Sequence, residues 1–196
     1  SKNGRSAAWV DNKIEKDLAI KGLNQSALTF LMQAEYSTDE VDTDRVDRGF
    51  RIERVVKNLT DATRAGTPNA PLKLGDQLLI TYRLNTRKLQ NFVALEDSLP
   101  AGVEVVNPNL ALVGNFYQLP PPDPQDRLLG LSYSEMRDRA ALLYFDTVDP
   151  GSGTYSILPR ATAAGTFRWP ATQVAPMYDS RFSGLSPSSV CVVSAD

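Results

Sequence analysis

The stretch that decides the fold is DRAALLYFDTVDPGSGTYSILPRATAAGTFRWPATQVAPMYD, residues 138–179. Within it, Ala140 to Phe145 is a short apolar run, and Thr154 to Ala161 is a second extended segment. Asp149 to Gly153 lies between the two and consists of turn residues. This order predicts a β-hairpin whose two strands are joined by a loop of several residues.

The last part of this stretch contains Pro170 and Pro176. Proline has no backbone N–H to donate, so residues 171–178 are predicted to cross the surface irregularly rather than to form a strand in mid-sheet. Met177 and Tyr178 end this crossing, where the proline before them and the polar residues after them indicate a projecting turn. The alternative is that both are core residues that anchor a loop, because large apolar side chains are usually packed.

The composition of the 196 residues favours a β-rich globular chain, since 13 prolines and 12 glycines are scattered between short apolar runs. The 21 Lys and Arg residues nearly balance the 23 Asp and Glu residues, which argues against the broad basic face of a nucleic-acid-binding protein. No apolar run approaches the roughly 18 residues that span a bilayer, and residues 1–10 lack the apolar core of a signal peptide.

The chain has no histidine and a single cysteine, Cys191. These counts exclude a Ser-His-Asp or Cys-His catalytic apparatus, a zinc site of the usual Cys and His ligands, and an internal disulfide. Cys191 lies in the alternating segment Ser189 to Val193, which predicts a closing strand with a buried, slowly reacting thiol. The sequence therefore predicts no enzymatic activity, no metal and no cofactor.

Alternation of apolar and polar residues predicts further strands. Gly49 to Lys57 is one of them, with Phe50, Ile52 and Val55 facing inward. Another has four large apolar side chains on a single face: Leu78, Ile80, Tyr82 and Leu84.

Two more strands, Asn91 to Glu96 and Val103 to Val106, flank a turn in which Gly102 is expected to take a positive φ. Together the elements predict an all-β fold, an antiparallel β-sandwich of fibronectin type III-like architecture with about seven strands over residues 46–196. Residues 1–45 are predicted to precede it as a β-hairpin segment, because residues 28–36 alternate strictly.

The acidic segment Ser37 to Asp47 could be read as a calcium loop, since Asp42 and Asp44 are two positions apart and Glu53 falls at position twelve. The ligand and the turn glycine expected at positions five and six are missing, which favours a solvated linker.

The proline-rich segment 107–127 allows two interpretations, a polyproline ligand for an SH3-like partner and an ordered insertion on the outside of the sandwich. The second is favoured. Glu135 and Asp138 could be imagined as a catalytic carboxylate pair, but Arg137 and Arg139 beside them would keep both ionised. A structural ion-pair cluster is the preferred interpretation.

Several short motifs occur in the order found in one known family. They are Gly75-Asp76, Glu96-Asp97-Ser98-Leu99-Pro100-Ala101-Gly102-Val103-Glu104, Arg137-Asp138-Arg139, Asp149-Pro150-Gly151, Arg160-Ala161-Thr162, Gly165-Thr166-Phe167, Trp169-Pro170 and Met177-Tyr178-Asp179. By their joint order and spacing, residues 46–180 resemble the C-terminal macroglobulin domain of bacterial alpha-2-macroglobulins. The resemblance implies a macroglobulin-type β-sandwich from a large periplasmic protease inhibitor, which can be anchored to the inner membrane.

Proteins of this family act as protease traps in host defence: cleavage of a bait region triggers collapse around the protease, and a thioester in a Cys-x-Glu-Gln motif can bind it covalently. That motif is absent here, because Cys191 is followed by two valines. The resemblance implies that this domain packs against the thioester domain of the parent chain. The contact surface is expected to be the loop from Thr172 to Ser180, with Met177 and Tyr178 at its centre shielding the bond. It also implies that residues 1–45 complete a preceding CUB-like domain, and that target proteases are partners of the full-length protein.

A function of another class also fits the residues, namely a stand-alone cell-surface adhesion or carbohydrate-binding β-sandwich, which would bind a glycan by itself. A hydrolase built on Glu135 and Asp138 is a third reading, which the neighbouring arginines disfavour.

Overall fold

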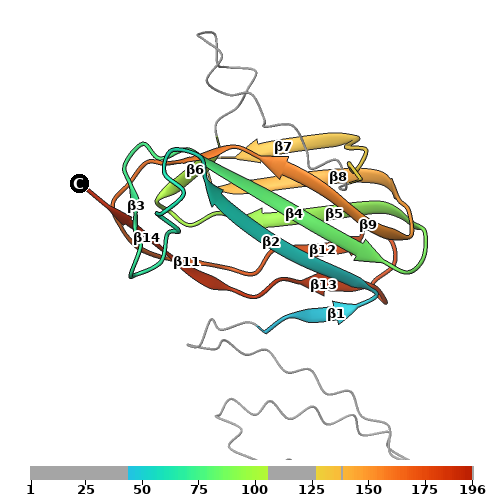
Figure 1. Ribbon diagram of the computed structural model, residues 1–196. Helices are drawn as coiled ribbons and strands as arrows, with labels where there is room; N and C mark the ends of the chain where they lie inside the picture. Colours follow the sequence, from blue (N-terminus) through green and yellow to red (C-terminus); the bar gives the residue numbers. More distant parts are fainter. Residues whose placement is uncertain (1–43, 106–126, 138, 196) are drawn as a thin grey trace, which may run out of the picture. The chain divides into compact units, whose positions relative to one another are not determined.

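The computed structural model describes residues 44–105, 127–137 and 139–195 (Figure 1). All the regular secondary structure in these ranges is β-strand. No described residue belongs to a helix that could cross a membrane. The hairpin expected before residue 44 and the proline-rich insertion up to residue 126 lie outside the described residues.

Fourteen strands are described in these ranges. They are β1 (Val46–Arg48), β2 (Phe50–Asn58), β3 (Leu72–Lys73), β4 (Leu78–Thr86), β5 (Gln90–Ser98), β6 (Val103–Val105), β7 (Tyr133–Arg137), β8 (Ala140–Val148), β9 (Gly151–Ile157), β10 (Pro159–Ala161), β11 (Gly165–Trp169), β12 (Gln173–Pro176), β13 (Ser183–Leu185) and β14 (Ser189–Ser194).

The strands form two main sheets. One contains three strands in the order β2-β4-β9, and the other contains six in the order β1-β13-β12-β5-β8-β7. The smaller sheets are β10-β6 and β11-β14-β3. Among the described strands the pairing is antiparallel except between β14 and β3, which are parallel. The predicted all-β antiparallel sandwich is confirmed, but the expected number of about seven strands is too low.

The hydrophobic core lies between the two main sheets. The hydroxyl of Tyr82 in β4 donates to Asp97 in β5 at 2.8 Å, and the rings of Tyr155 in β9 and Phe145 in β8 are in edge contact at 6.1 Å. Figure 1 accordingly shows β4 and β9 in a layer in front of β5. The four apolar residues predicted to share one face of β4 are all buried, each contributing about 1.5–3 kcal/mol by the usual transfer values: Leu78, Ile80, Tyr82 and Leu84.

The hairpin predicted from the opening stretch is wrong. β8 pairs with β5 and β7, whereas β9 pairs with β4, so the turn at Asp149 and Pro150 carries the chain from one main sheet to the other. Turn residues mark where a strand ends, but they do not select its partner. Here β8 pairs with β5 and β9 pairs with β4, and these partners lie in opposite layers, while Asp149 and Pro150 of the turn stay exposed.

The irregular crossing predicted for residues 171–178 is also wrong, because β12 lies inside the six-stranded sheet between β5 and β13. Met177 donates its backbone N–H to Phe92 O of β5 at 2.8 Å. Successive N–H groups along a strand point to opposite sides, so the nitrogen of Pro176 faces away from β5. The pairing of β12 with β13 ends at Val174 and Gly184, and the proline therefore withholds no ladder hydrogen bond.

Two smaller expectations are corrected in β2 and after β5. Phe50 and Ile52 are buried as predicted, but Val56 rather than Val55 packs against the core, and Arg54 shares the inward face. Gly102 does not adopt a positive φ. It is required because a β-carbon there would collide with the Phe167 ring and lie 2.7 Å from a carbonyl oxygen.

Candidate functional site

The exposed turn after β12 contains the two residues singled out from the sequence. Met177 is 54% exposed and Tyr178 is 80% exposed, so the interpretation of both as core residues is wrong. The predicted contact loop 172–180 is only partly accessible, because Thr172, Val174 and Pro176 are buried. Gln173 is exposed, and the exposed apolar residues of the loop are Met177 and Tyr178.

This turn is closed on its far side by a local ion pair. Arg181 donates from Nε and Nη2 to the two oxygens of Asp179, at 2.9 and 2.7 Å. These hydrogen bonds lower the pKa of Asp179 below its usual range. On its near side the turn is bonded to β5 through Met177 and Phe92, as described above. The backbone that presents Met177 and Tyr178 is thus held at both ends.

A buried ion pair at the opposite end of the same strands was missed by sequence reasoning. Arg54 Nη1 lies 2.7 Å from Asp97 Oδ1, and the two side chains are 4% and 0% exposed. Asp97 also accepts hydrogen bonds from the hydroxyls of Tyr82, at 2.8 Å, and Thr172, at 3.0 Å. The Arg54 guanidinium lies 4.3 Å from the ring centroid of Trp169, a cation–π arrangement.

The chemistry of this network is structural. Burial, followed by the charge of Asp97, raises the pKa of Tyr82 well above its usual range, so its hydroxyl stays protonated and donates. Arg54 alternates in phase with Phe50 and Ile52, and that phase was the available signal for its inward direction. The charge of Arg54 argued against an inward direction, although that direction is the correct one.

Asp76, part of the Gly75-Asp76 motif, organises a second polar cluster. It accepts hydrogen bonds from Arg64 at 2.6 and 2.9 Å, from Asn58 Nδ2 at 2.7 Å and from Lys73 N at 2.9 Å. Although burial raises it, these donors lower the pKa of Asp76 below its usual range. The cluster ties the loop that follows β2 to the loop that precedes β4.

The candidate carboxylate pair is only partly described. Glu135 accepts a hydrogen bond from Arg137 Nε at 2.8 Å on the exposed face of β7, which is the structural pairing expected. Asp138 lies outside the described residues. Glu135 has no described partner suited to general acid or base catalysis.

Cys191 lies in β14 and is buried, as the alternation predicts. Burial raises the pKa of its thiol to about 11. Since the thiolate is the reactive form, the thiol is expected to react slowly.

Of the proposed calcium loop, Asp42 lies outside the described residues, and Val46 and Asp47 belong to β1. Within ranges 44–105, 127–137 and 139–195, no three His, Cys, Asp or Glu side chains gather in a way that could hold a metal ion.

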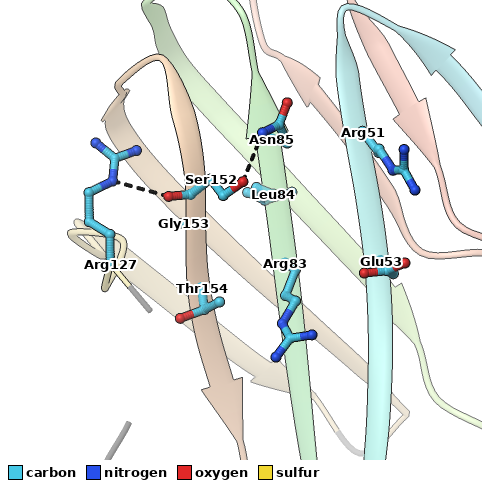
Figure 2. Close-up of a pocket in the computed structure, with 9 residues that line it drawn as sticks. All are labelled: Arg51, Glu53, Arg83, Leu84, Asn85, Arg127, Ser152, Gly153 and Thr154. Atoms are coloured by element: carbon cyan, nitrogen blue, oxygen red, sulfur yellow. Dashed lines mark hydrogen bonds between the residues drawn. The ribbon is translucent and has the colours of Figure 1, made fainter. Parts of the chain in front are cut away.

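A polar groove of about 370 Å³ lies on the outer face of the β2-β4-β9 sheet (Figure 2). It is lined by three arginines, Arg51, Arg83 and Arg127, together with Glu53 and short polar side chains. Arg127 is already bonded to Asp149 at 3.1 Å. Figure 2 shows the three guanidinium groups pointing in different directions, so they do not converge on one anion.

The family model described as the bacterial alpha-2-macroglobulin MG10 domain matches residues 49–180. No curated protein sequence matches the chain.

Among solved structures, a Salmonella alpha-2-macroglobulin reacted with methylamine is 22% identical with a TM-score of 0.61, over 78% of this chain and 10% of that chain. The native conformation of Escherichia coli alpha-2-macroglobulin is 22% identical with a TM-score of 0.64, over 76% of this chain and 10% of that one. A native E. coli fragment from domain MG7 to the C-terminus is 20% identical with a TM-score of 0.63, over 76% and 24%.

These likenesses establish the fold, and this chain spans about a tenth of the length of the whole alpha-2-macroglobulins that it matches. The family model covers most of the chain, including the motifs from Gly75-Asp76 to Met177-Tyr178 that carry the resemblance. The chain therefore belongs to the bacterial alpha-2-macroglobulin MG10 domain family.

Proposed function

We propose that this domain is a non-catalytic part of a protease-trapping alpha-2-macroglobulin, in which Met177 and Tyr178 pack over the thioester of a neighbouring domain. The observation that carries the proposal is the exposure of both side chains on a turn that is held at each end. Large apolar side chains exposed side by side are a mark of contact surfaces.

The chemistry asked of this surface is exclusion. A thioester is lost when water or an amine reaches its carbonyl carbon, and an apolar sulfur and an aromatic ring packed over the bond keep both away. No proton transfer is needed from either residue. The contribution of the domain is packing and shape.

The rest of the proposal follows from family membership. The parent is a periplasmic protease inhibitor that can be anchored to the inner membrane, its target proteases bind the full-length protein, and residues 1–45 complete a preceding CUB-like domain. The MG10 family match and the motif order support this assignment.

The test is the double variant Met177→Ala, Tyr178→Ala in a full-length, thioester-bearing parent. Methylamine forms an amide with the thioester carbonyl and the C–S bond breaks, with the proton passing to the released thiol, which a thiol reagent then counts. Loss of the two packed side chains should raise the rate of thiol release at least about tenfold. Cys191 adds little background because it is buried.

The matched control is Tyr133→Ala, which removes a tyrosine that is also exposed but lies on the edge strand β7. Its rate of thiol release should equal that of the unaltered protein. A folded double variant with unchanged methylamine reactivity would overturn the shielding role. In a parent without a thioester, the double variant should only weaken packing between domains.

A further inference from the structure

Phe92 has a backbone conformation that is unusual for a strand residue. Its φ is +52°, and no other described non-glycine residue has a positive φ. An antiparallel strand normally has a φ near −140°, and a bulky side chain in the left-handed region is a costly outlier. The pairing of β5 with β8 includes Asn91 and Val93 but passes over Phe92.

This strain is not offset by burial of the ring. The Phe92 side chain is 53% exposed, whereas its neighbour Val93 is fully buried. Residues held in sparsely populated conformations persist where the surroundings fix them, and they concentrate at functional sites.

The conformation of Phe92 brings it against the exposed turn in two ways. Its carbonyl oxygen accepts the backbone N–H of Met177 at 2.8 Å, and its ring meets that of Tyr178 in a T-shaped contact with 5.7 Å between centroids and an interplanar angle of 81°. Two exposed rings from distant parts of the sequence therefore support each other outside the core. Edge-to-face contacts of this kind fix ring orientation as well as adding attraction.

We propose that Phe92 is the third residue of the contact surface and positions the Tyr178 ring for packing against an apolar face of the neighbouring domain. This inference rests on the function proposed above for Met177 and Tyr178, and it adds a residue from β5 that none of the motifs contains. The surface then has an apolar sulfur and two perpendicular rings, so it fits a partner that presents apolar side chains.

The positioning role is tested first in this chain. Nuclear magnetic resonance reports the ring of Tyr178, assigned with Tyr178→Phe. Phe92→Ala should move the Tyr178 ring signals toward their unstructured positions, because the ring current of Phe92 is lost. Leu89→Ala is the matched control, since Leu89 is equally exposed at 53% and lies three positions away without a described ring contact to Tyr178. Unchanged Tyr178 signals in folded Phe92→Ala would overturn the role.

The strain is tested by comparing two variants at the same position. Glycine adopts a φ of +52° without steric cost, whereas alanine does not. In an ordinary strand the alanine variant is the more stable of the two. At position 92 we expect the reverse, a higher unfolding temperature for Phe92→Gly than for Phe92→Ala. A higher unfolding temperature for Phe92→Ala than for Phe92→Gly would show that the backbone at position 92 is not strained.

The contact with the partner is tested in the thioester-bearing parent. Phe92→Ala should raise the rate of thiol release by methylamine about two- to tenfold, the range that loss of one aromatic pair implies, and by less than the Met177 and Tyr178 double variant. If the double variant accelerates release and Phe92→Ala does not, shielding stands and the role of Phe92 fails. If the double variant itself has no effect, the shielding function fails, and the Tyr178 ring signals still decide whether Phe92 positions that ring.

Discussion

The two ends of the β5 and β12 strand pair have opposite chemistry. At one end Asp97 and Thr172 are fully buried, and a charge lies where apolar side chains would be expected. At the other end, about 17 Å along the strands, Phe92, Met177 and Tyr178 are exposed, and apolar side chains lie where polar ones would be expected. The same ladder of backbone hydrogen bonds joins both ends.

This contrast separates the buried end, which holds the domain together, from the exposed end, which is available to a partner. The buried end joins β2, β4 and β5 through directional bonds that fix how the two main sheets face each other. The side chains at the exposed end are accessible, so they are available to a partner and are expected to add little to the stability of the domain.

Removal of the buried carboxylate should have the largest effect. Asp97→Ala leaves the Arg54 guanidinium buried without its counter-ion, which should lower the free energy of unfolding by about 3–5 kcal/mol in urea denaturation. Asp149→Ala breaks the exposed pair with Arg127 and should cost at most about 1 kcal/mol. Equal losses for the two variants would show that the buried pair is not special.

Two tyrosine-to-phenylalanine changes compare the ends directly. Tyr82→Phe removes only the hydroxyl that donates to Asp97, and a hydrogen bond to a charged group contributes about 1.5–3 kcal/mol to the free energy of unfolding. Tyr178→Phe makes the same chemical change on an exposed ring and should leave the stability unchanged. A measurable loss for Tyr178→Phe would contradict the contrast.

Alkaline pH should lower the stability of the folded domain through the buried thiol of Cys191. The folded-state pKa is raised to about 11 by burial, from 9.0 for the free thiol, so the unfolded chain loses its proton first as the pH rises. Stability is therefore full below pH 9 and declines above it, by about 1.4 kcal/mol at pH 10. Cys191→Ala should remove most of the decline between pH 9 and 10 in denaturation measured at each pH.

The smallest effect on stability is expected at the exposed turn. Met177→Ala with Tyr178→Ala should change the free energy of unfolding by no more than about 0.5 kcal/mol per residue, as is usual for exposed positions. A loss of several kcal/mol in the isolated chain would mean that this turn supports the fold. The exposed end would then stabilise the fold as the buried end does, and the two ends would not differ in role.

The sequence predicted which side of a strand is buried better than it predicted which strands pair with each other. The buried face of β4 follows from alternation alone, because one period-2 pattern allows one inward face. The partners of β8 and β9 do not follow, since a two-residue connection can close a hairpin or cross between sheets, and the choice depends on strands far away in the chain.

Residue-type rules account for the other errors. Pro170 and Pro176 argued against a strand, yet the nitrogen of Pro176 faces a side where no ladder bond is made. Arg54 argued for an outward face, yet Asp97 lies opposite it. Nothing in the sequence indicated the backbone conformation of Phe92, because a positive φ is not expected of phenylalanine. Each case depends on a neighbour that is remote in sequence.

The parallel pairing of β14 with β3 has a consequence for synthesis on the ribosome. Leu72 and Val193 are register partners, although about 120 positions separate them in the chain. At roughly 5–20 residues per second, on the order of ten seconds pass between the emergence of one partner and that of the other. During this interval Leu72, buried in the finished domain, has no strand beside it. A newly made chain therefore exposes this apolar residue for that interval, and a chaperone that covers apolar segments can bind there until β14 has been made.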